Sequence, residues 1–131
     1  MAKTILGCGS GPVASAANET SYWRIGGIPE KSTTEADQEA KFRSAGTLAN
    51  LYVVLTANAI TSASTFRTRK NGANGGLSVS LTASTTGEFK DNSGSDSISS
   101  IDRICYQFVP GAATNTISLA TAAMSFAATT D

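Results

Sequence analysis

TLANLYVVLTAN, residues 47–58, is the stretch whose pattern contributes most to the expected fold. Its apolar side chains alternate between the two faces of an extended strand, with Leu51, Val53 and Leu55 on one face and Tyr52 and Val54 on the other. A strand with apolar residues on both faces must be covered on both sides. The stretch therefore predicts a strand of a β-sandwich, or one that also forms a subunit interface.

A second alternating stretch, TFRTRKNGANGG at 65–76, surrounds the tight-turn dipeptide Asn71-Gly72. Its residues divide between two faces, with Phe66, Thr68 and Lys70 on one and Arg67 and Arg69 on the other. The closely spaced cations indicate either the wet face of a β-hairpin or a nucleic-acid patch. No aromatic residues for base stacking are interleaved with them, which favours the hairpin.

The remaining strand signals are shorter and are separated by turn residues. They lie at 21–28, 40–43, 77–83, 86–91, 102–109 and 116–126, where a change of phase near the end suggests a β-bulge. Residues 30–43 also hold one expected helical turn, and NSGS at 92–95 reads as a β-turn. The pattern predicts an all-β fold, an antiparallel jelly-roll-like sandwich of about eight strands.

Charge and length restrict the classes of protein that fit. The 131 residues carry 10 Lys plus Arg and 10 Asp plus Glu, so the net charge is zero and a nucleic-acid partner is not expected. No apolar run approaches the roughly 20 residues that span a bilayer, so no membrane partner is expected either. We expect a flexible N-terminal arm at 1–20, followed by one sandwich domain at 21–131.

Catalytic and metal chemistry have little support in this composition. The chain has no histidine, which removes the commonest general base and transition-metal ligand. Cys8 and Cys105 are expected to be reduced thiols, with Cys105 buried in a strand. DNSGSD at 91–96 offers oxygen ligands for calcium, but Asp and Ser are also what a β-turn selects. We expect no enzyme activity, no catalytic residues, no metal and no cofactor.

The four acidic residues that might supply a glycosidase-like carboxylate pair are Glu88, Asp91, Asp96 and Asp102. Acids in short loops of a small sandwich are usually solvated, so we interpret them as turn residues.

Tyr22, Trp23 and Arg24 form the most binding-like cluster. An exposed Trp beside an Arg can stack on a sugar, which makes the three residues a candidate glycan contact. The alternative is that Trp23, the single Trp of the chain, belongs to the core.

Five short segments of the sequence together carry a resemblance to a known family. They are SYWRIGG (21–27), AGTLANLYVVL (45–55), TFRTRKNG (65–72), TGEFKD (86–91) and IDRICYQF (101–108). In these phrases the chain resembles a family from tailed bacteriophages and related environmental viruses. The resemblance implies a trimeric jelly roll, similar in outline to tumour-necrosis-factor-like and complement-like domains. Such proteins serve as capsid decoration (cement) proteins or as head and tail fibre modules.

We therefore expect a structural virion protein, made in the host cytoplasm, that binds the outer surface of a tailed-phage head as a homotrimer. Its partner would be the major capsid protein, and its effect would be to stabilise the shell. The alternative is a fibre or receptor-binding module that recognises a host surface glycan.

Two sets of residues are expected to make the contacts of a decoration protein. The capsid-binding residues of the arm would be Ile5, Leu6, Pro12 and Val13. The trimer interface would use outward apolar side chains of two strands, Tyr52, Val54, Tyr106 and Phe108.

Overall fold

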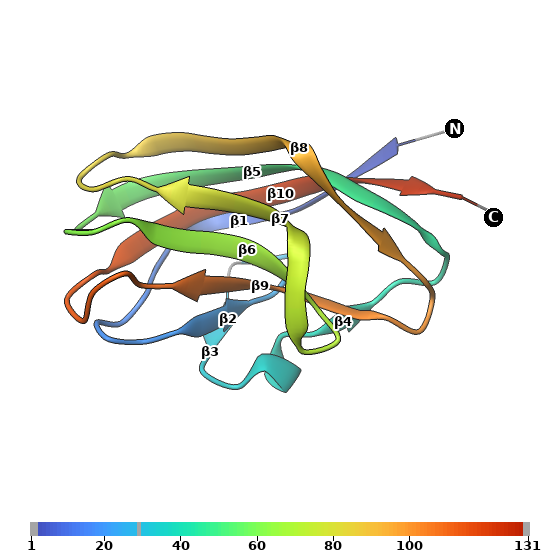
Figure 1. The fold of residues 1–131 in the computed structure, drawn as a ribbon, viewed down its shortest axis with the longest axis horizontal. Helices are drawn as coiled ribbons and strands as arrows, with labels where there is room; N and C mark the ends of the chain where they lie inside the picture. The colour runs from blue at the N-terminus through green and yellow to red at the C-terminus, as the bar shows by residue number, and fades with distance from the viewer. Residues whose placement is uncertain (1–2, 29, 130–131) are drawn as a thin grey trace.

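The chain folds into two antiparallel sheets that pack face to face (Figure 1). The computed structural model describes residues 3–28 and 30–129, without the side chains of residues 3, 8 and 10–12. Sheet A has four strands in the order β1-β10-β5-β8. They are β1 (Lys3–Ala14), β10 (Ile117–Ala128), β5 (Gly46–Asn58) and β8 (Gly87–Ile98).

Sheet B has the order β3-β2-β9-β6-β7, and β4 also pairs with β9. Its members are β2 (Ser21–Trp23), β3 (Lys31–Ser32), β4 (Ala40–Lys41), β6 (Ser64–Lys70), β7 (Ala73–Leu81) and β9 (Arg103–Val109). One 3-10 turn, η1 (Glu35–Asp37), lies between β3 and β4, in the segment expected to hold a helical turn.

The long strand pairs are nested in the sequence. β1 pairs with β10, β2 with β9, β5 with β8, and β6 with β7, all antiparallel. The chain therefore runs as one long antiparallel hairpin that is folded back across two sheets. The prediction of an all-β antiparallel sandwich is confirmed.

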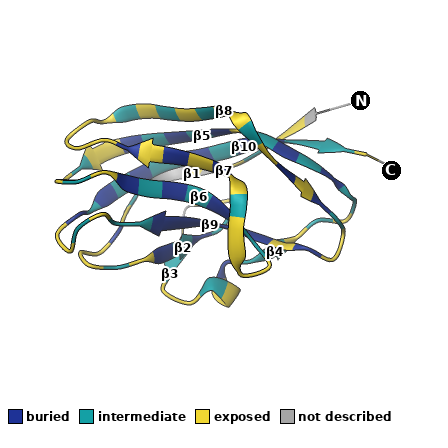
Figure 2. Ribbon diagram, in the orientation of Figure 1, coloured by how far each residue is buried: buried dark blue, intermediate teal, exposed yellow. Residues whose placement is uncertain are grey.

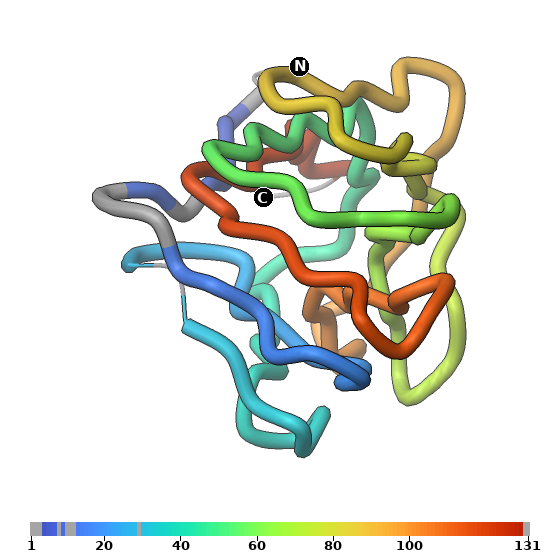
Figure 3. Tube along the Cα trace, turned by 90° about the vertical axis from the view of Figure 1, so that its left-hand side faces the viewer, coloured from blue at the N-terminus to red at the C-terminus, as the bar shows by residue number. Residues whose placement is uncertain are grey.

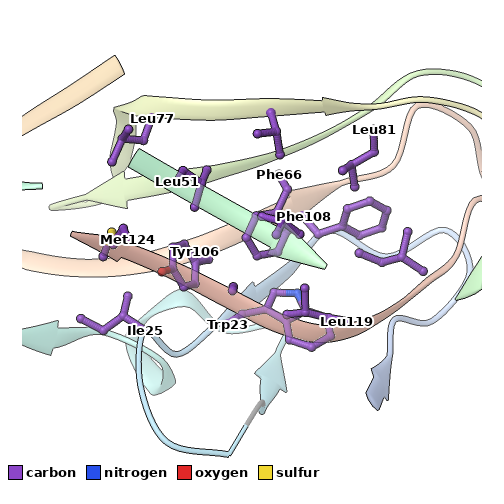
Figure 4. Close-up of a cluster of buried hydrophobic side chains, with 14 of the residues drawn as sticks. Trp23, Ile25, Leu51, Phe66, Leu77, Leu81, Tyr106, Phe108, Leu119 and Met124 are labelled. Carbon is purple, nitrogen blue, oxygen red and sulfur yellow. The ribbon is translucent and has the colours of Figure 1, made fainter. Parts of the chain in front are cut away.

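The core lies between the sheets and is rich in aromatic side chains (Figure 4). Trp23, Phe66, Tyr106 and Phe108 are completely buried. The rings of Phe66 and Tyr106 lie 5.3 Å apart between centroids, in a tilted arrangement. Fully buried aromatic side chains of this size supply much of the hydrophobic stabilisation of a small sandwich.

The two stretches with the clearest alternation behave as expected. In β5, Leu51, Val53 and Leu55 are buried while Tyr52 and Val54 are half-buried on the opposite face. β6 and β7 form the expected hairpin, and Arg69 is paired with Glu35 at 2.9 Å. Alternating burial along these strands is visible in Figure 2.

Two strands differ from their expected outlines. β8 continues through the expected turn at 92–95, because the three residues 92–94 bulge out opposite Asn50 and pairing resumes at Ser95. β10 contains the expected irregularity, with register shifts on both sides of Leu119 and another between Ala123 and Ser125.

The N-terminal segment requires a correction. Residues 1–20 were expected to form a loose arm, but Lys3–Ala14 form β1, paired with β10 from Lys3 to Ala14. Alternation explains the pairing, because the side chain of Leu6 turns inward against the core while the neighbouring Ile5 remains 71% exposed. β1 is thus an edge strand of sheet A, and it lies at the margin of the molecule in Figure 3.

Candidate interaction surface

The outer face of sheet A is a nearly flat surface of small side chains around Tyr52 and Val54. Two cross-strand rows define it: Gly7–Ala123–Tyr52–Lys90 and Gly9–Thr121–Val54–Glu88. Directly opposed residues of neighbouring antiparallel strands point to the same face. The rows therefore place one aromatic and one aliphatic side chain between residues of low volume, with charges only on β8.

The charges on β8 are paired with each other and hold the Tyr52 ring. The Tyr52 hydroxyl donates a 2.7 Å hydrogen bond to Glu88 Oε1, and Lys90 Nζ lies 3.1 Å from Glu88 Oε2. Lys90 Nζ also lies 5.6 Å from the centroid of the Tyr52 ring, within cation–π range. The hydrogen bond to Glu88 raises the pKa of Tyr52, and the same bond, assisted by Lys90, lowers the pKa of Glu88. The ring is thus oriented by a neutral ion pair.

Beside Tyr52 the face is hollowed where β5 has an extra residue. Between the pairs Tyr52–Ala123 and Ala49–Ser125, Asn50 and Leu51 of β5 lie opposite Met124 alone on β10. Asn50 adopts φ 56° in the β5 bulge, and its Nδ2 donates a 3.0 Å hydrogen bond to Ser125 Oγ. The hollow has a volume of about 240 Å³ and is lined by Ile5, Asn50, Tyr52, Ala123, Met124 and Ser125.

The sequence contains a signal for this hollow that alternation alone misses. Leu48 and Leu51 are both buried although they are separated by three positions, an odd spacing that places them on opposite faces of a regular strand. One residue too many between them requires a bulge, and Asn50 is among the residues that tolerate a left-handed backbone.

The four residues expected at the trimer interface do not share a surface. Tyr52 and Val54 do lie on the outer face of sheet A. Tyr106 and Phe108 are completely buried, so this half of the prediction is wrong. The reason is that the face of β9 that carries Tyr106 and Phe108 is the one turned toward the core, where Phe108 lies opposite the buried Phe66.

The expected glycan contact is also corrected. Trp23 is completely buried, and its Nε1 donates a 2.9 Å hydrogen bond to Ser21 Oγ, so the ring offers no face to a sugar. Tyr22 and Arg24 are half-buried, and Arg24 forms a 2.6 Å ion pair with Glu30. The cluster therefore divides, with Trp23 in the core as in the alternative interpretation.

The residues expected to bind a capsid from a free arm lie on a folded strand instead. Ile5 is exposed on β1, whereas Leu6 and Val13 are partly buried and pack against the core. The side chain of Pro12 lies outside the described residues. Of the three members whose side chains the structure describes, Ile5 is the one with a broadly accessible apolar side chain.

Two acidic residues of β8 reach across to β7 and bind its backbone. Asp91 Oδ2 accepts the N–H of Ser78 at 3.0 Å, and Asp96 Oδ1 accepts the N–H of Gly76 at 2.6 Å. Asp96 Oδ2 also accepts the hydroxyl of Thr68 at 2.6 Å. We call Asp91, Asp96 and their partners on β6 and β7 the carboxylate clasp. It ties the edge of sheet A to the edge of sheet B.

The clasp commits the carboxylates of Asp91 and Asp96 to backbone N–H groups of β7. Asp91 also accepts the N–H groups of Ser93 and Gly94, and the backbone bonds from Ser78 and Gly94 are the main reason that its pKa falls to about 2. The fourth acid, Asp102, accepts the N–H of Ser99, which is the main reason that its pKa also falls to about 2. Within the described residues, no group of three or more His, Cys, Asp or Glu side chains is placed to hold a metal ion.

The buried Cys105 lies in β9 as expected for a thiol within a strand. Burial, with a smaller contribution from Glu35, raises its pKa to about 12. A thiol with such a pKa is almost entirely protonated at neutral pH and is a poor nucleophile.

Comparison with known proteins finds no matching family model, no matching curated protein and no matching solved structure. Among residues 3–28 and 30–129, no helix has the length and apolar character to cross a membrane.

Proposed function

We propose that this chain is a structural virion protein, a capsid decoration protein that binds the outer surface of a tailed-phage head as a homotrimer and stabilises the shell. The observation that carries the proposal is the outer face of sheet A. A flat, largely uncharged surface with one oriented Tyr and one Val suits repeated docking on protein better than capture of a small molecule. The nested strand pairs agree with the jelly roll that the sequence resemblance implies.

In this proposal the three-fold contact uses Tyr52 and Val54 on the outer face of sheet A. Both side chains are half-buried in the single chain, and Tyr52 lines the 240 Å³ hollow, which would receive an apolar side chain of the neighbouring copy. Rigid, preorganised aromatic side chains lose little conformational entropy on association. The chain would be made in the host cytoplasm and would meet the major capsid protein on the assembled particle.

The decoration role is mechanical. A protein that binds the mature shell but not its separated capsomers stabilises the shell by mass action. Several weak contacts from one trimer add through effective concentration, so each contact can be small. The glycan-binding alternative loses its expected stacking residue because Trp23 is buried. On the described outer face of sheet A, no other feature favours glycan binding.

The first test is the number of copies of this chain per purified virion, measured by quantitative mass spectrometry against the major capsid protein. We expect hundreds of copies in a fixed ratio to that protein. A few to a few dozen copies would instead indicate a fibre, and complete absence would contradict any virion role.

The second test is a charge placed on the proposed contact face. Val54→Lys should abolish trimers in light scattering and should remove the increase in the melting temperature of decorated shells. The matched control is Thr65→Lys, at a half-buried position on the outward side of β6 in the opposite sheet, which should leave both properties intact. Equal behaviour of the two variants would contradict the assigned face.

A further inference from the structure

The beginning of β1 is a stretch of long sheet edge that the described part of the fold leaves uncovered. Five strands form the sheet margins, and two of them, β3 and β4, are only two residues long. β7 and β8 are tied to each other by the carboxylate clasp. β1 has 12 residues, and the sequence from Thr4 to Asn18 contains no charged residue. Natural edge strands are usually blunted by charge, shortness or cover, because unpaired N–H and C=O groups attract another strand.

The hydrogen bonds of β1 show which backbone groups face outward. Gly9 donates its N–H to Gly27 O at 3.1 Å, away from β10. The pairing with β10 is regular from Lys3 to Gly9, and alternate residues of an edge strand direct their backbone groups to the same side. Lys3, Ile5 and Gly7 therefore direct their N–H and C=O groups away from β10.

The outward groups are open only near the beginning of the strand. The loop that contains Gly26 and Gly27 covers the stretch around Gly9, and a β-carbon on Gly26 would lie 3.8 Å from the carbonyl oxygen of Gly7. In the described structure no backbone hydrogen bond occupies the N–H or C=O of Ile5 or the N–H of Gly7. The available edge thus extends from Lys3 to the N–H of Gly7.

We propose that this edge pairs with the same edge of a second copy, antiparallel and across a two-fold axis at Ile5. In this register Ile5 of each copy exchanges two hydrogen bonds with Ile5 of the other. Each Gly7 N–H then meets the carbonyl of Lys3 in the other copy, and the covered carbonyl of Gly7 is not needed. The two four-stranded sheets become one continuous sheet.

A second copy is the occupant that the chemistry favours. An isologous contact brings each residue against its own kind or its symmetry partner, so a charged edge would repel itself. The one charged residue of the available edge, Lys3, lies opposite Gly7 of the other copy in this register and not opposite itself, and the residue at the axis is the exposed, apolar Ile5. Across the axis the two Ile5 side chains would cover each other, which removes an exposed hydrophobic residue from water.

The contact does not depend on the proposed virion role, and it uses the edge of β1 and not Tyr52 and Val54, although Ile5 also lines the hollow beside Tyr52. A two-fold axis joins only two copies, so it links one assembly to another of the same kind. With four main-chain hydrogen bonds and one apolar pair it is small, and we expect it to form at high protein concentration or on a surface that already gathers many copies.

The test is a charge exchange at position 5, in the full chain. Wild-type protein should double in mass, by light scattering, as its concentration rises from micromolar toward millimolar. Ile5→Lys alone and Ile5→Glu alone should stay at half that mass, because like charges meet across the axis. A one-to-one mixture of the two variants should recover the doubled mass, since only then do opposite charges meet.

The matched control is Ile101→Lys, the same substitution at an isoleucine that is 77% exposed on another part of the surface. It should double in mass as the wild type does. A concentration-independent wild-type mass, unchanged doubling in Ile5→Lys, or a mixture that stays unpaired would each overturn the proposal. If shells are decorated normally by Ile5→Lys, the virion role stands whatever the outcome at the edge.

Amide hydrogen exchange supplies a second readout that does not depend on total mass. The amides of Ile5 and Gly7 should become protected as concentration rises, while the amide of Leu6, which faces β10, should be protected throughout. Rapid exchange at Ile5 and Gly7 at every concentration would contradict the pairing.

Discussion

The two long margins of the sandwich are built in opposite ways. At the β7–β8 margin, carboxylates of Asp91 and Asp96 bind the N–H groups of Ser78 and Gly76, so the edge of one sheet is tied to the other. At the β1 margin, the N–H groups of Ile5 and Gly7 point outward without a partner, and the side chain of Ile5 is exposed. The difference shows how one small fold can tie one sheet margin with side-chain hydrogen bonds and leave backbone groups of the other margin exposed.

The closed margin depends on Asp96 more than on any other single side chain of the clasp, and Asp96→Ala is the largest effect that we expect. It leaves the N–H of Gly76 without its acceptor, and it leaves the buried hydroxyl of Thr68 with only the longer, 3.3 Å hydrogen bond to the carbonyl of Leu77. Loss of hydrogen bonds to a buried carboxylate costs about 3 kcal/mol of unfolding free energy. Urea unfolding should show this loss.

The control for Asp96→Ala is Asp37→Ala, at an exposed residue that accepts a hydrogen bond from Ser32. It should change the free energy of unfolding by less than about 0.5 kcal/mol. Similar losses of unfolding free energy in the two variants would mean that the clasp contributes no more to stability than an exposed hydrogen bond does.

Glycine substitutions compare the margins directly. A β-carbon on Gly76 would lie 2.3 Å from the backbone oxygen of Ser95, where the two strands cross. Gly76→Ala should therefore cost about 2 kcal/mol, since backbone must shift to make room. On the open margin, a β-carbon on Gly9 would meet the Thr121 hydroxyl at 3.3 Å, which a small movement relieves.

Gly9→Ala should accordingly stay within about 0.5 kcal/mol of the wild type in the same urea experiment. A loss at Gly9 that equals the loss at Gly76 would show that both margins are equally crowded.

Much of this fold could be predicted from alternation in the sequence, and the failures have physical causes. β5, the β6–β7 hairpin and β9 follow directly from apolar residues at every second position. β1 was missed because TILGCGSGPVA is rich in glycine and its larger apolar residues, Ile5, Leu6 and Val13, show no sustained alternation, so its strand character comes from pairing with β10 and not from propensity.

The candidate surface was only half predictable for a related reason. Alternation shows that Tyr52 and Phe108 each lie on the opposite face of the strand from their immediate neighbours in the sequence. It does not say which of the two faces points into the core. That choice depends on the long-range partners of each face: Phe108 lies opposite Phe66 of β6, whereas Tyr52 lies opposite Ala123 of β10 and Lys90 of β8. The clasp was missed because Asp, Ser and Gly at 91–96 are also typical of turns, and only a long-range partner on β7 distinguishes the two.

Acid should weaken the closed margin selectively. The pKa of Asp91 is about 2 in the folded chain, below the ordinary value of 3.8, because of the backbone bonds from Ser78 and Gly94. The unfolded chain therefore takes up a proton first, so this stabilisation is complete above about pH 4 and is lost between pH 3.8 and 2. Asp102, whose pKa is lowered to about 2 chiefly by the N–H of Ser99, contributes in the same window.

The measurement is the urea midpoint from pH 6 to pH 2, for the wild type and for Asp91→Asn. The wild-type midpoint should be flat down to about pH 4 and should then fall. In Asp91→Asn the midpoint should be lower at neutral pH and should fall less steeply in acid. Parallel curves would contradict the assignment of the acid sensitivity to Asp91.

The smallest expected effect is that of Tyr52→Phe, and it sharpens the comparison between stability and association. The hydroxyl that is removed donates a hydrogen bond to Glu88 at the exposed edge of the outer face. Glu88 keeps Lys90 as a partner in the variant. The melting temperature of the single chain should therefore be unchanged within error, because exposed polar contacts contribute little. The ring itself remains over the hollow, so assembly through this face should also persist.

Tyr52→Ser is the matched variant that removes the ring as well as its bond to Glu88. It should leave the fold intact, since Tyr52 points away from the core, but it should prevent the proposed three-fold contact. Light scattering then separates the two roles: loss of trimers in Tyr52→Ser alone assigns the contact to the ring. Loss in both variants would assign it to the hydroxyl and Glu88, whereas retention in both would exclude Tyr52 from the interface.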